Sequence, residues 1–575
     1  MNRLISTILG LFIAVPALLA SEYRVVVIPV EFSDVAFRDR QSNVNEKISK
    51  AKRYFDDQFT GYRVFSFDVL PVVKLQKTMS WYGANSTARK DERIDQLVRD
   101  ACALVNRDLS VYDNDGDGTI DNICIISAGE SESDGGGVSC IWPQQGYLSE
   151  RGGTISVSGK TVDSFTVCAE ESGFGTFCHE YAHSFGLQDL YDTDGNGSGG
   201  TSAGVWGSLS LMDEGSKNDG GNTPPNFCAV ELEQLGIGKP VELRQGYHTL
   251  RPVSSSKEYL RIESDSDGEY FLLECRDKSG WDAYAGGGGL LVYHIDRSAN
   301  NSWYSDYYKH NLSAAERWSY NQVNCRPDRQ CARIIPAVPN AREVKNVFFP
   351  QPGHSALGAE TDPPFKYWSG ATSELLIHKI SVLDDGSVSF SVIIPITMRE
   401  ISAFQDAAIL NWSADNSLDV KECQVSWHKE GNSTVSGTST MTIPKQEDGF
   451  YYAILEKLSP ATEYSATIKL ICEDGSVHSK SGKFTTKSMQ KNVRPFIYLR
   501  FTRRSEDGRF YAGESIPLRV YNAQDVQNVT WYFNDRPIFP DNGGFWLITG
   551  SGTLKAKVWY KDGSADVIIK EIEVL

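Results

Sequence analysis

The sequence contains little that would direct it to nucleic acid or into a membrane. Its 575 residues carry a formal net charge of −17 and include no block rich in lysine and arginine. Attraction to nucleic acid or to an anionic membrane surface is therefore not expected. After residue 20, no apolar run approaches the ~20 residues that a spanning helix requires. Histidine is also scarce, with nine residues in the whole chain, so a regular spacing between two histidines is informative.

Residues 1–20 have the pattern of a signal peptide. Arg3 gives a basic start, residues 4–15 form an apolar run, and Ala20 is a small residue before the polar Ser21. The run is too short to span a membrane. We expect cleavage after residue 20 and export of the mature chain to the medium, the cell surface or the periplasm, with no integral membrane segment left.

The eleven cysteines show no CxxC spacing, so neither a zinc ribbon nor a thioredoxin-type site is expected. Export to an oxidising compartment would let many of them pair. Cys325 and Cys331 bracket a short polar loop, and Cys423 and Cys472 lie on two expected strands of one later module. These two pairs are the candidate disulfides, and the odd number leaves one thiol free.

The length of the chain predicts three or four domains. Residues 21–240 open in an α/β pattern: a buried type of strand at 23–30 is followed by a helical stretch at 43–59 and a second apolar strand at 123–126. From 241 to 393 the pattern changes to short alternating strands with glycine-rich turns, which predicts a β-rich continuation.

Two further modules are expected at 394–488 and 489–575, both with alternating strands. The spacing from Leu458 to Tyr464 is similar to the tyrosine corner of fibronectin type III domains. The last module resembles immunoglobulin-like or PKD-like domains. Neither carries evident chemistry, so we interpret both as spacers or as modules that bind cell-surface or extracellular ligands.

The stretch from His179 to Asp189 has the spacing of a zinc site. Residues four apart lie on one face of a helix, so His179 and His183 can direct two imidazoles at one ion. Glu180 is then free to act as the general base on a zinc-activated water. Gly186 can take the positive φ that ends the helix, and the chain can turn back so that Asp189 becomes the third ligand.

Two neighbouring features bear on this site. Met212 lies at a distance after Asp189 that resembles the Met-turn of metzincin peptidases, where it would form an apolar floor. Asp192, Asp194 and Asn196 form an oxygen-rich loop directly after the motif. This loop is either a calcium site or the source of Asp192 as an alternative third zinc ligand, and the sequence does not decide between these readings.

A second acidic loop begins at Asp113. Oxygen side chains stand at positions 1, 3, 5 and 9 of an EF-hand-like pattern, with Cys124 in place of the usual glutamate at position 12. The loop predicts a structural calcium ion, whose expected ligands are Asp113, Asp115, Asp117, Thr119 and Asp121.

These motifs together resemble the M6 family of metallopeptidases, of the immune inhibitor A type, over about residues 22–393. The resemblance implies a secreted endopeptidase that cuts protein or peptide substrates with one zinc and usually bound calcium. In this chain Gln188 stands where the family often has proline, and Glu214 stands where many metzincins have tyrosine, so the group that stabilises the oxyanion is unassigned and Tyr191 is a candidate. The segments that carry the resemblance are 27–34, 112–118, 141–143, 179–192, 210–213, 269–274 and 289–296.

Two rival functions are less well supported. Gly200–Gly204 matches the GxSxG pattern of serine hydrolases, but no buried strand precedes it and no helix is expected after it. A catalytically silent adhesin or glycan- or protein-binding protein would be free to lose Glu180, which this chain retains. We therefore expect a multidomain protein: an α/β zincin-type metallopeptidase domain, a β-rich region, and two all-β sandwich domains.

Overall fold

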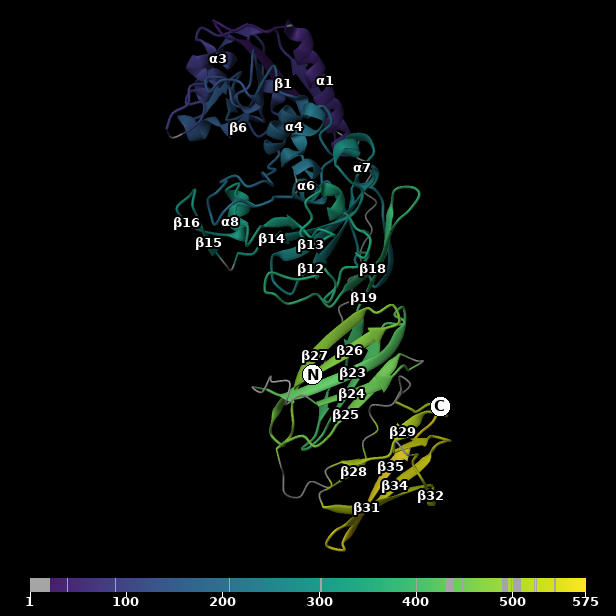
Figure 1. The fold of residues 1–575 in the computed structure, drawn as a ribbon. Helices are drawn as coiled ribbons and strands as arrows, with labels where there is room; N and C mark the ends of the chain where they lie inside the picture. Colours follow the sequence, from purple (N-terminus) through teal and green to yellow (C-terminus); the bar gives the residue numbers. More distant parts are fainter. Residues whose placement is uncertain are drawn as a thin grey trace. The chain divides into compact units, whose positions relative to one another are not determined.

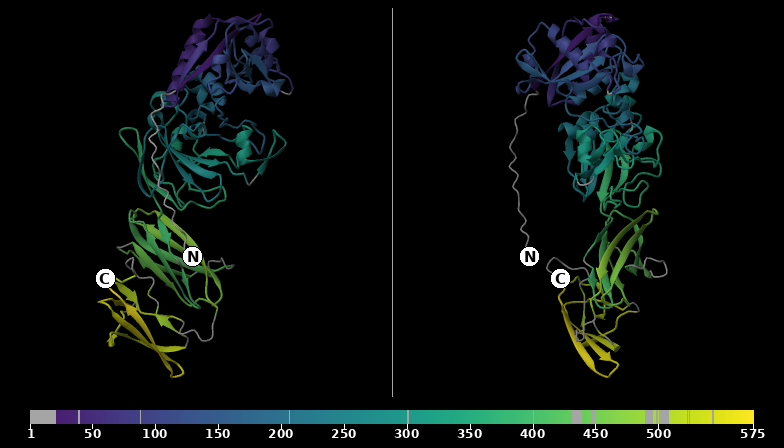
Figure 2. Two further views of the ribbon diagram at one scale, coloured as in Figure 1. Left: turned by 180° about the vertical axis from the view of Figure 1, so that it is seen from behind. Right: turned by 90° about the vertical axis from the view of Figure 1, so that its left-hand side faces the viewer.

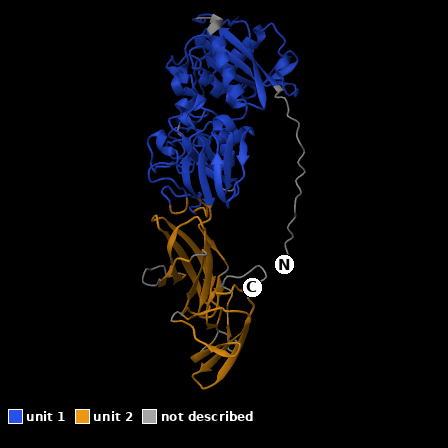
Figure 3. Cartoon of the chain, turned by 90° about the vertical axis from the view of Figure 1, so that its right-hand side faces the viewer, with its two compact units in different colours: residues 1–357, 361–371, 377–392 blue, residues 358–360, 372–376, 393–575 orange. Residues whose placement is uncertain are grey.

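The computed structural model describes residues 21–575 except 39, 88, 206, 300–301, 400, 431–438, 447–448, 489–494, 498, 500–507, 522, 524 and 542–543. The predicted signal peptide lies outside these residues. The chain divides into two compact units (Figure 3). Unit 1 comprises 1–357, 361–371 and 377–392, and unit 2 comprises 358–360, 372–376 and 393–575.

Unit 1 opens with a six-stranded sheet in the order β2-β1-β5-β9-β6, with β3 pairing with β1 (Figure 1). Its strands are parallel except β6, which lies antiparallel at the edge beside β9. Strands covered on both faces carry continuous apolar runs, as β5 does with Ile-Cys-Ile-Ile. The strands are β1 (Ser21–Glu31), β2 (Arg63–Val69), β3 (Val73–Lys74), β5 (Ile123–Ser127), β6 (Gln144–Tyr147) and β9 (Ser164–Ala169).

Helices cover both faces of this sheet (Figure 2). Val25 and Val27 of β1 share a core with α1 (Arg40–Gln58) and α4 (Phe174–His183). The alternate residues Val26 and Ile28 pack with α3 (Ile94–Leu104). The sequence predicted the α/β opening correctly, and α4 is the helix that carries the zinc motif. The smaller elements here are α2 (Met79–Tyr82), β4 (Thr119–Ile120), β7 (Ile155–Val157) and β8 (Lys160–Val162).

The β-rich part of unit 1 shares one hydrophobic core with α4. Leu272 and Leu291, from the sheet β10-β12-β13-β14-β17, belong to the same buried cluster as Tyr181 and Met212. The strands are β10 (Lys239–Val241), β11 (Gly246–Leu250), β12 (Glu258–Glu263), β13 (Glu269–Arg276), β14 (Gly289–Asp296), β15 (Ser302–Ser305), β16 (His310–Ser313), β17 (Ala332–Ile334), β18 (Leu376–Val382) and β19 (Val388–Ile393). The helices are α5 (Asn218–Gly221), α6 (Ala229–Leu235), α7 (Val253–Ser256) and α8 (Ala314–Ser319).

Unit 2 is built from β-sheets. In its first part, Trp412 and Ile468 from two different sheets pack in one core. The hydroxyl of Tyr464 accepts a hydrogen bond from the Ser459 amide at 2.8 Å, the contact that a tyrosine corner makes. These sheets contain β20 (Ile396–Met398), β21 (Ser402–Ala403), β22 (Ala408–Ala414), β23 (Val420–Lys429), β24 (Ser439–Pro444), β25 (Phe450–Leu455), β26 (Glu463–Cys472) and β27 (Val477–Thr485).

The second part of unit 2 has its own core around Trp531 and Leu554. Its main sheet has the order β32-β31-β34-β35. The β-rich character expected of both C-terminal modules is confirmed, whereas their assignment to named sandwich families stays a prediction. The strands are β28 (Phe496–Ile497), β29 (Ser515–Pro517), β30 (Val520–Tyr521), β31 (Val526–Phe533), β32 (Arg536–Ile538), β33 (Phe545–Leu547), β34 (Gly552–Tyr560) and β35 (Ala565–Ile572).

All eleven cysteines are free thiols, and all are buried. The expected pairs Cys325–Cys331 and Cys423–Cys472 are therefore wrong. These side chains behave as small apolar residues: burial raises the pKa of Cys331 and of Cys423 to about 12, which keeps both protonated. Among the described residues, no helix combines the length and the apolar character needed to cross a membrane.

Candidate metal centre

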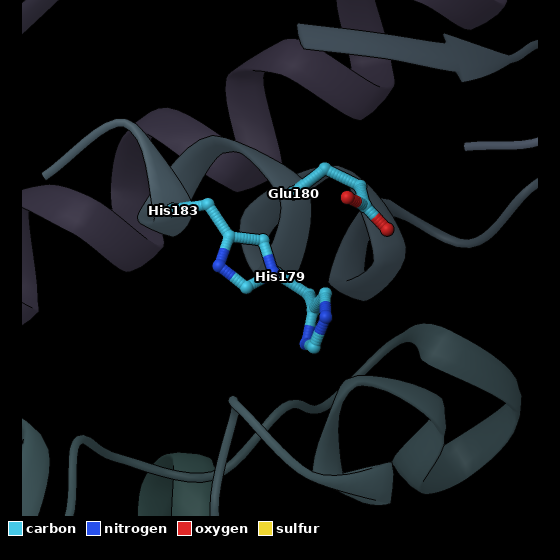
Figure 4. A group of neighbouring side chains, drawn as sticks. All are labelled: His179, Glu180 and His183. Atoms are coloured by element: carbon cyan, nitrogen blue, oxygen red, sulfur yellow. The ribbon is translucent and has the colours of Figure 1, made fainter. Parts of the chain in front are cut away.

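Helix α4 directs both imidazoles of the motif to one side. His179 and His183 are one turn apart near the C-terminal end of the helix, and their ring centroids are 4.9 Å apart. Figure 4 shows the two rings projecting from the same side of α4, with the Glu180 carboxylate beside them. The spacing in the sequence therefore produces the shared face that a metal site requires.

Asp189 reaches the same point through a turn at Gly186. Gly186 has φ of +89°, and its amide donates to the carbonyl of His183 at 2.9 Å, which reverses the chain after α4. Oδ1 of Asp189 then lies 3.2 Å from Nε2 of His179 and 3.3 Å from Nε2 of His183. The structure thus brings together the three side chains that the motif predicted as ligands.

The hydrogen bonds of the two imidazoles determine which nitrogen faces the centre. Nδ1 of His179 lies 2.8 Å from the carbonyl of Leu211, and Nδ1 of His183 lies 2.8 Å from the carbonyl of Leu187. A carbonyl can only accept, so each Nδ1 carries a proton, and each imidazole in its neutral form presents a lone pair at Nε2. Oδ1 of Asp189 is buried, and the polar atoms that face it are the two Nε2 atoms. When a divalent cation takes the place of the Nε2 proton, three electron-rich atoms face it, which is a donor set that zinc accepts.

The charges around the centre favour a cation in the same place. Burial by itself would lower the pKa of His179, but the hydrogen bond and charge of Asp189, together with the charge of Glu180, raise it to about 9. Burial would raise the pKa of Asp189, but the two imidazoles hold it well below its usual range. The raised pKa of His179 and the lowered pKa of Asp189 both show that positive charge is stabilised at the Nε2 atoms. A bound divalent cation would place positive charge at the same point.

Glu180 lies beside the two histidines, with a carboxylate oxygen within 4.8 Å of a ring nitrogen of each, and the edge strand β6 holds its carboxylate. Its Oε2 accepts a hydrogen bond from the Gln145 amide of β6 at 3.0 Å. Burial, as the largest effect, raises the pKa of Glu180, as a general base near neutral pH requires. Sequence reasoning missed Gln145, because it contributes a backbone group from a segment 35 residues away from Glu180.

Met212 is fully buried beneath this region. Its carbonyl accepts from the Leu190 amide at 2.7 Å, and its amide donates to Oε1 of Glu231 at 3.0 Å. The residue before it, Leu211, is the one whose carbonyl orients His179. The turn around Met212 therefore supports both the helix and the ligand loop, and Glu231 is a supporting residue that no motif indicated.

The structure shows where two further candidates lie: Asp192, the alternative third ligand, and Tyr191, the candidate oxyanion donor. Asp192 lies with Asp194 and Cys325, whose ligand atoms are within 4.8 Å of one another, whereas the contacts to both histidines come from Asp189. Tyr191 stacks near His179, with ring centroids 6.4 Å apart. Burial and the charge of Asp189 raise the pKa of its phenol, so the hydroxyl stays protonated and can donate a hydrogen bond.

The acidic loop at Asp113 assembles only part of the predicted calcium set. Asp113, Asp115 and Asp117 have carboxylate oxygens within 4.8 Å of one another, and Thr119 donates its amide to Asp117 at 2.7 Å. However, Lys160 Nζ lies 2.7 Å from Oδ2 of Asp113. Oδ2 of Asp121 accepts from the amide and the side chain of Asn114. Lys160 and Asn114 are the partners that the spacing of the loop did not indicate.

The rival serine motif lacks the geometry of a nucleophile. Ser202 lies outside any helix or strand, and its hydroxyl donates to the carbonyl of Asn324. A nucleophile elbow requires a strand before the serine and a helix after it.

An α/β domain whose helix brings two histidines and a glutamate together, with an aspartate beside the histidines, has the arrangement of the HExxH class of metallohydrolases. Residues 27–236 match the family described as Immune inhibitor A peptidase M6, catalytic domain. Over these residues the chain is similar to the catalytic domain of the M6 metallopeptidases, the family that the sequence motifs resemble.

Two curated relatives each match about a third of the chain. The pre-pro-metalloprotease PrtV of Vibrio cholerae serotype O1 is 29% identical over 247 residues, which cover 36% of this chain and 26% of that protein. Immune inhibitor A of Bacillus thuringiensis subsp. alesti is 28% identical over 251 residues, which cover 35% of this chain and 36% of that protein. The chain thus spans about a quarter to a third of the length of these relatives.

Solved structures also match, over a smaller part of the chain, and one example is an fn3 domain. The fn3 domain of human collagen alpha-1(XX) chain is 20% identical and covers 17% of this chain and 83% of that chain, at a TM-score of 0.14. That score is too low to identify a fold.

Proposed function

We propose that this chain is a secreted zinc-dependent endopeptidase that hydrolyses peptide bonds in protein or peptide substrates. The observation that supports it most directly is the approach of Asp189 Oδ1 to both histidine Nε2 atoms, with both Nδ1 protons donated elsewhere. His179, His183 and Asp189 would hold the zinc, and a fourth position would stay open for water and substrate.

Zinc, when bound, would lower the pKa of a water molecule and polarise the scissile carbonyl. Glu180 would accept the proton of that water and later transfer it to the leaving amine. The Gln145 amide would keep the carboxylate of Glu180 in place through both transfers. Tyr191 is the proposed donor to the oxyanion that develops on the substrate carbonyl.

We propose further that calcium binds the loop containing Asp113, Asp115 and Asp117 as a structural ion. Lys160 would have to move away from Asp113 for the ion to bind, because both require the same carboxylate. Export by the predicted signal peptide would bring the chain to calcium-rich surroundings.

The test is zinc content and hydrolysis of unfolded casein, measured on the mature chain and on its Glu180→Gln variant. We expect one zinc per chain in both and a fall in kcat/KM of about 10²- to 10⁴-fold in the variant, because only the proton-accepting oxygen is changed. Glu242→Gln, which replaces an exposed glutamate, serves as the control and should leave both quantities unchanged.

The rival functions predict different outcomes. A zinc-loaded wild-type chain that leaves casein intact would favour the silent adhesin or binding protein. Hydrolysis that resists chelators and is stopped by a serine-directed inhibitor would favour the serine hydrolase.

A further inference from the structure

Asn321 reaches the proposed zinc ligand Asp189 from the β-rich part of unit 1. It lies after α8, 85 positions beyond the end of the segment 27–236 that matches the peptidase family. Its Oδ1 accepts from the Asp189 amide at 2.7 Å, and its Nδ2 donates to Oδ2 of Asp189 at 2.7 Å. One side-chain amide therefore binds both the backbone and the carboxylate of the same residue.

The chemistry of the two partners fixes the orientation of this amide. A backbone N–H can only donate, so the atom that faces it must be the amide oxygen. The –NH₂ group must then face the carboxylate, where a charge-assisted hydrogen bond forms. With Oδ2 of Asp189 engaged in this way, Oδ1 is the oxygen left to face the two histidines.

The backbone of Asn321 holds the side chain in place. Its φ of +53° lies in the left-handed region, and the Gln322 amide donates to the carbonyl of Arg317 at 2.8 Å, which ends α8 in the manner of a C-terminal cap. The carbonyl of Asn321 accepts from the Thr193 hydroxyl at 2.8 Å. Asn321 is thus hydrogen-bonded to both ends of the segment 189–193, the loop that carries Asp189.

A second contact ties the same two segments together. Nδ2 of Asn324 donates to the carbonyl of Leu190 at 2.8 Å, and Oδ1 of Asn324 accepts from the amide of Ala332 at 2.9 Å. The loop that carries Asp189 is therefore connected to the sheet of the β-rich part through β17, rather than to the family-matched segment alone.

We propose that Asn321 is a positioning residue for the third zinc ligand: it orients Asp189 so that a single oxygen faces the metal. This inference rests on the proposed zinc peptidase function. It implies that the β-rich part completes the metal centre by supplying a side chain that hydrogen-bonds to one of the ligands. Such partners typically change metal affinity by about 10- to 100-fold when they are removed.

The competing explanation is that Asn321 serves only as a left-handed cap of α8. Glycine fills that role at least as well as asparagine, so Asn321→Gly separates the two explanations. Asn340 offers a matched control, because it is also an asparagine with positive φ, at +57°, and is exposed in a loop of the same unit.

The experiment compares the full mature chain with its Asn321→Gly, Asn321→Ala and Asn340→Gly variants. The zinc Kd is measured by competition with a chelator, and thermal unfolding is recorded for the zinc-free proteins. We expect the zinc Kd to rise about 10- to 100-fold in both Asn321 variants. Zinc-free Asn321→Gly should still unfold in one cooperative transition, at a temperature below that of the wild type because two hydrogen bonds to Asp189 are lost. Asn340→Gly should match the wild type in both measurements.

Each other result has a definite meaning. If the wild type binds no zinc and leaves casein intact, the proposed function fails. If the wild type binds zinc and cleaves casein while Asn321→Gly keeps the wild-type Kd, the positioning role alone is overturned. A rise in Kd of equal size in Asn340→Gly would also overturn it, because the effect would then belong to any such loop asparagine.

Discussion

Each proposed ligand at the metal centre is oriented by a group that lies outside the HExxH motif. The carbonyls of Leu211 and Leu187 fix the two imidazoles, and Asn321 fixes the carboxylate of Asp189. Backbone carbonyls cannot be removed by substitution, so their effect must be tested through the side chains that hold them. At the residue scale, the buried side chain of Glu231 allows such a test for Leu211, and buried Asp91 allows a test beside the strand that holds Glu180.

Glu231 holds the turn that contains Leu211 and Met212. It accepts from the Ser210 hydroxyl at 2.6 Å and from the amides of Met212 at 3.0 Å and Cys228 at 2.6 Å. In Glu231→Gln the –NH₂ group would face at least one of these donors, which leaves a buried hydrogen bond unmade. We expect a loss of about 1–3 kcal/mol in the free energy of unfolding and weaker zinc binding, measured by denaturant titration and chelator competition.

The control for Glu231 is Glu263→Gln, whose side chain is 67% exposed. Substitution of such a surface glutamate should change stability by less than about 0.5 kcal/mol. An equal loss in the two variants would show that the Met212 turn does not depend on Glu231.

Asp91 provides a pH-dependent test near the edge strand. It is fully buried, and its Oδ2 accepts from the Trp142 amide at 2.9 Å and from the Gln144 side chain at 2.7 Å. Burial, as the largest effect, raises the pKa of Asp91 from 3.8 to about 7. Because the folded protein then holds a proton that the unfolded chain releases, stability falls as pH rises from about 4 to 7.

Asp91→Asn removes this titration, and asparagine accepts the positive φ of +43° at this position. We expect the wild type to lose on the order of 1–3 kcal/mol relative to the variant between pH 5 and pH 8, measured by denaturant unfolding at each pH. Asp384→Asn, at an exposed position, is the surface control and should stay within about 0.5 kcal/mol of the wild type in each measurement. If the difference in free energy of unfolding between the wild type and Asp91→Asn did not change with pH, the raised pKa of Asp91 would be contradicted.

At the element scale, the metal centre depends on the close approach of α4 to the turn after Met212. A Cβ placed at Gly175 would lie 2.1 Å from the carbonyl oxygen of Ser216, in the 3₁₀ turn Glu214–Lys217. Gly175→Ala must therefore push this turn away from the helix. We expect a loss of about 1–3 kcal/mol in stability together with a higher zinc Kd, measured by thermal unfolding and chelator competition.

Gly137→Ala is the matched control, because a Cβ there meets nothing within 4 Å. Its stability should stay close to that of the wild type. If Gly175→Ala were equally well tolerated, the packing of α4 on this turn would not be needed to hold His179.

Local patterns in the sequence predicted the elements that carry the chemistry. The helical stretch expected at 43–59 forms α1, Arg40–Gln58, and the apolar strand at 123–126 forms β5. The spacing of His179, Glu180 and His183 predicted their arrangement on α4, since a helix alone determines which residues share a face. Such predictions succeed because they depend on neighbours within one element.

Contacts between distant segments could not be read in this way. Asn321 is 132 positions from Asp189, and no spacing rule connects them. The predicted disulfides failed for a related reason: proximity of Cys325 and Cys331 in the sequence does not specify how their side chains pack. In the acidic loop, the pattern predicted Asp121 as a ligand, but it did not indicate that Asn114 would engage the same carboxylate.

At the scale of the whole molecule, every residue assigned to the metal centre belongs to unit 1. Glu180 and Asn321, from opposite parts of this unit, act on one centre, and the hydrophobic core around Tyr181 and Leu272 is continuous. The β-rich part should therefore be indispensable, whereas none of the residues assigned to the site comes from unit 2. This separation can be tested by shortening the chain from its C-terminal end.

A fragment of residues 21–395 should keep the zinc Kd and the kcat/KM for unfolded casein within about two-fold of the full mature chain, because no residue of the centre is removed. A fragment of residues 21–240 ends at the domain boundary expected from the sequence, yet it lacks Asn321 and the core residues of β13 and β14. It should bind zinc weakly and expose apolar surface, measured by chelator competition and dye binding. If the shorter fragment matched the longer one, the metal centre would be complete within the family-matched segment, and the β-rich part would have another role.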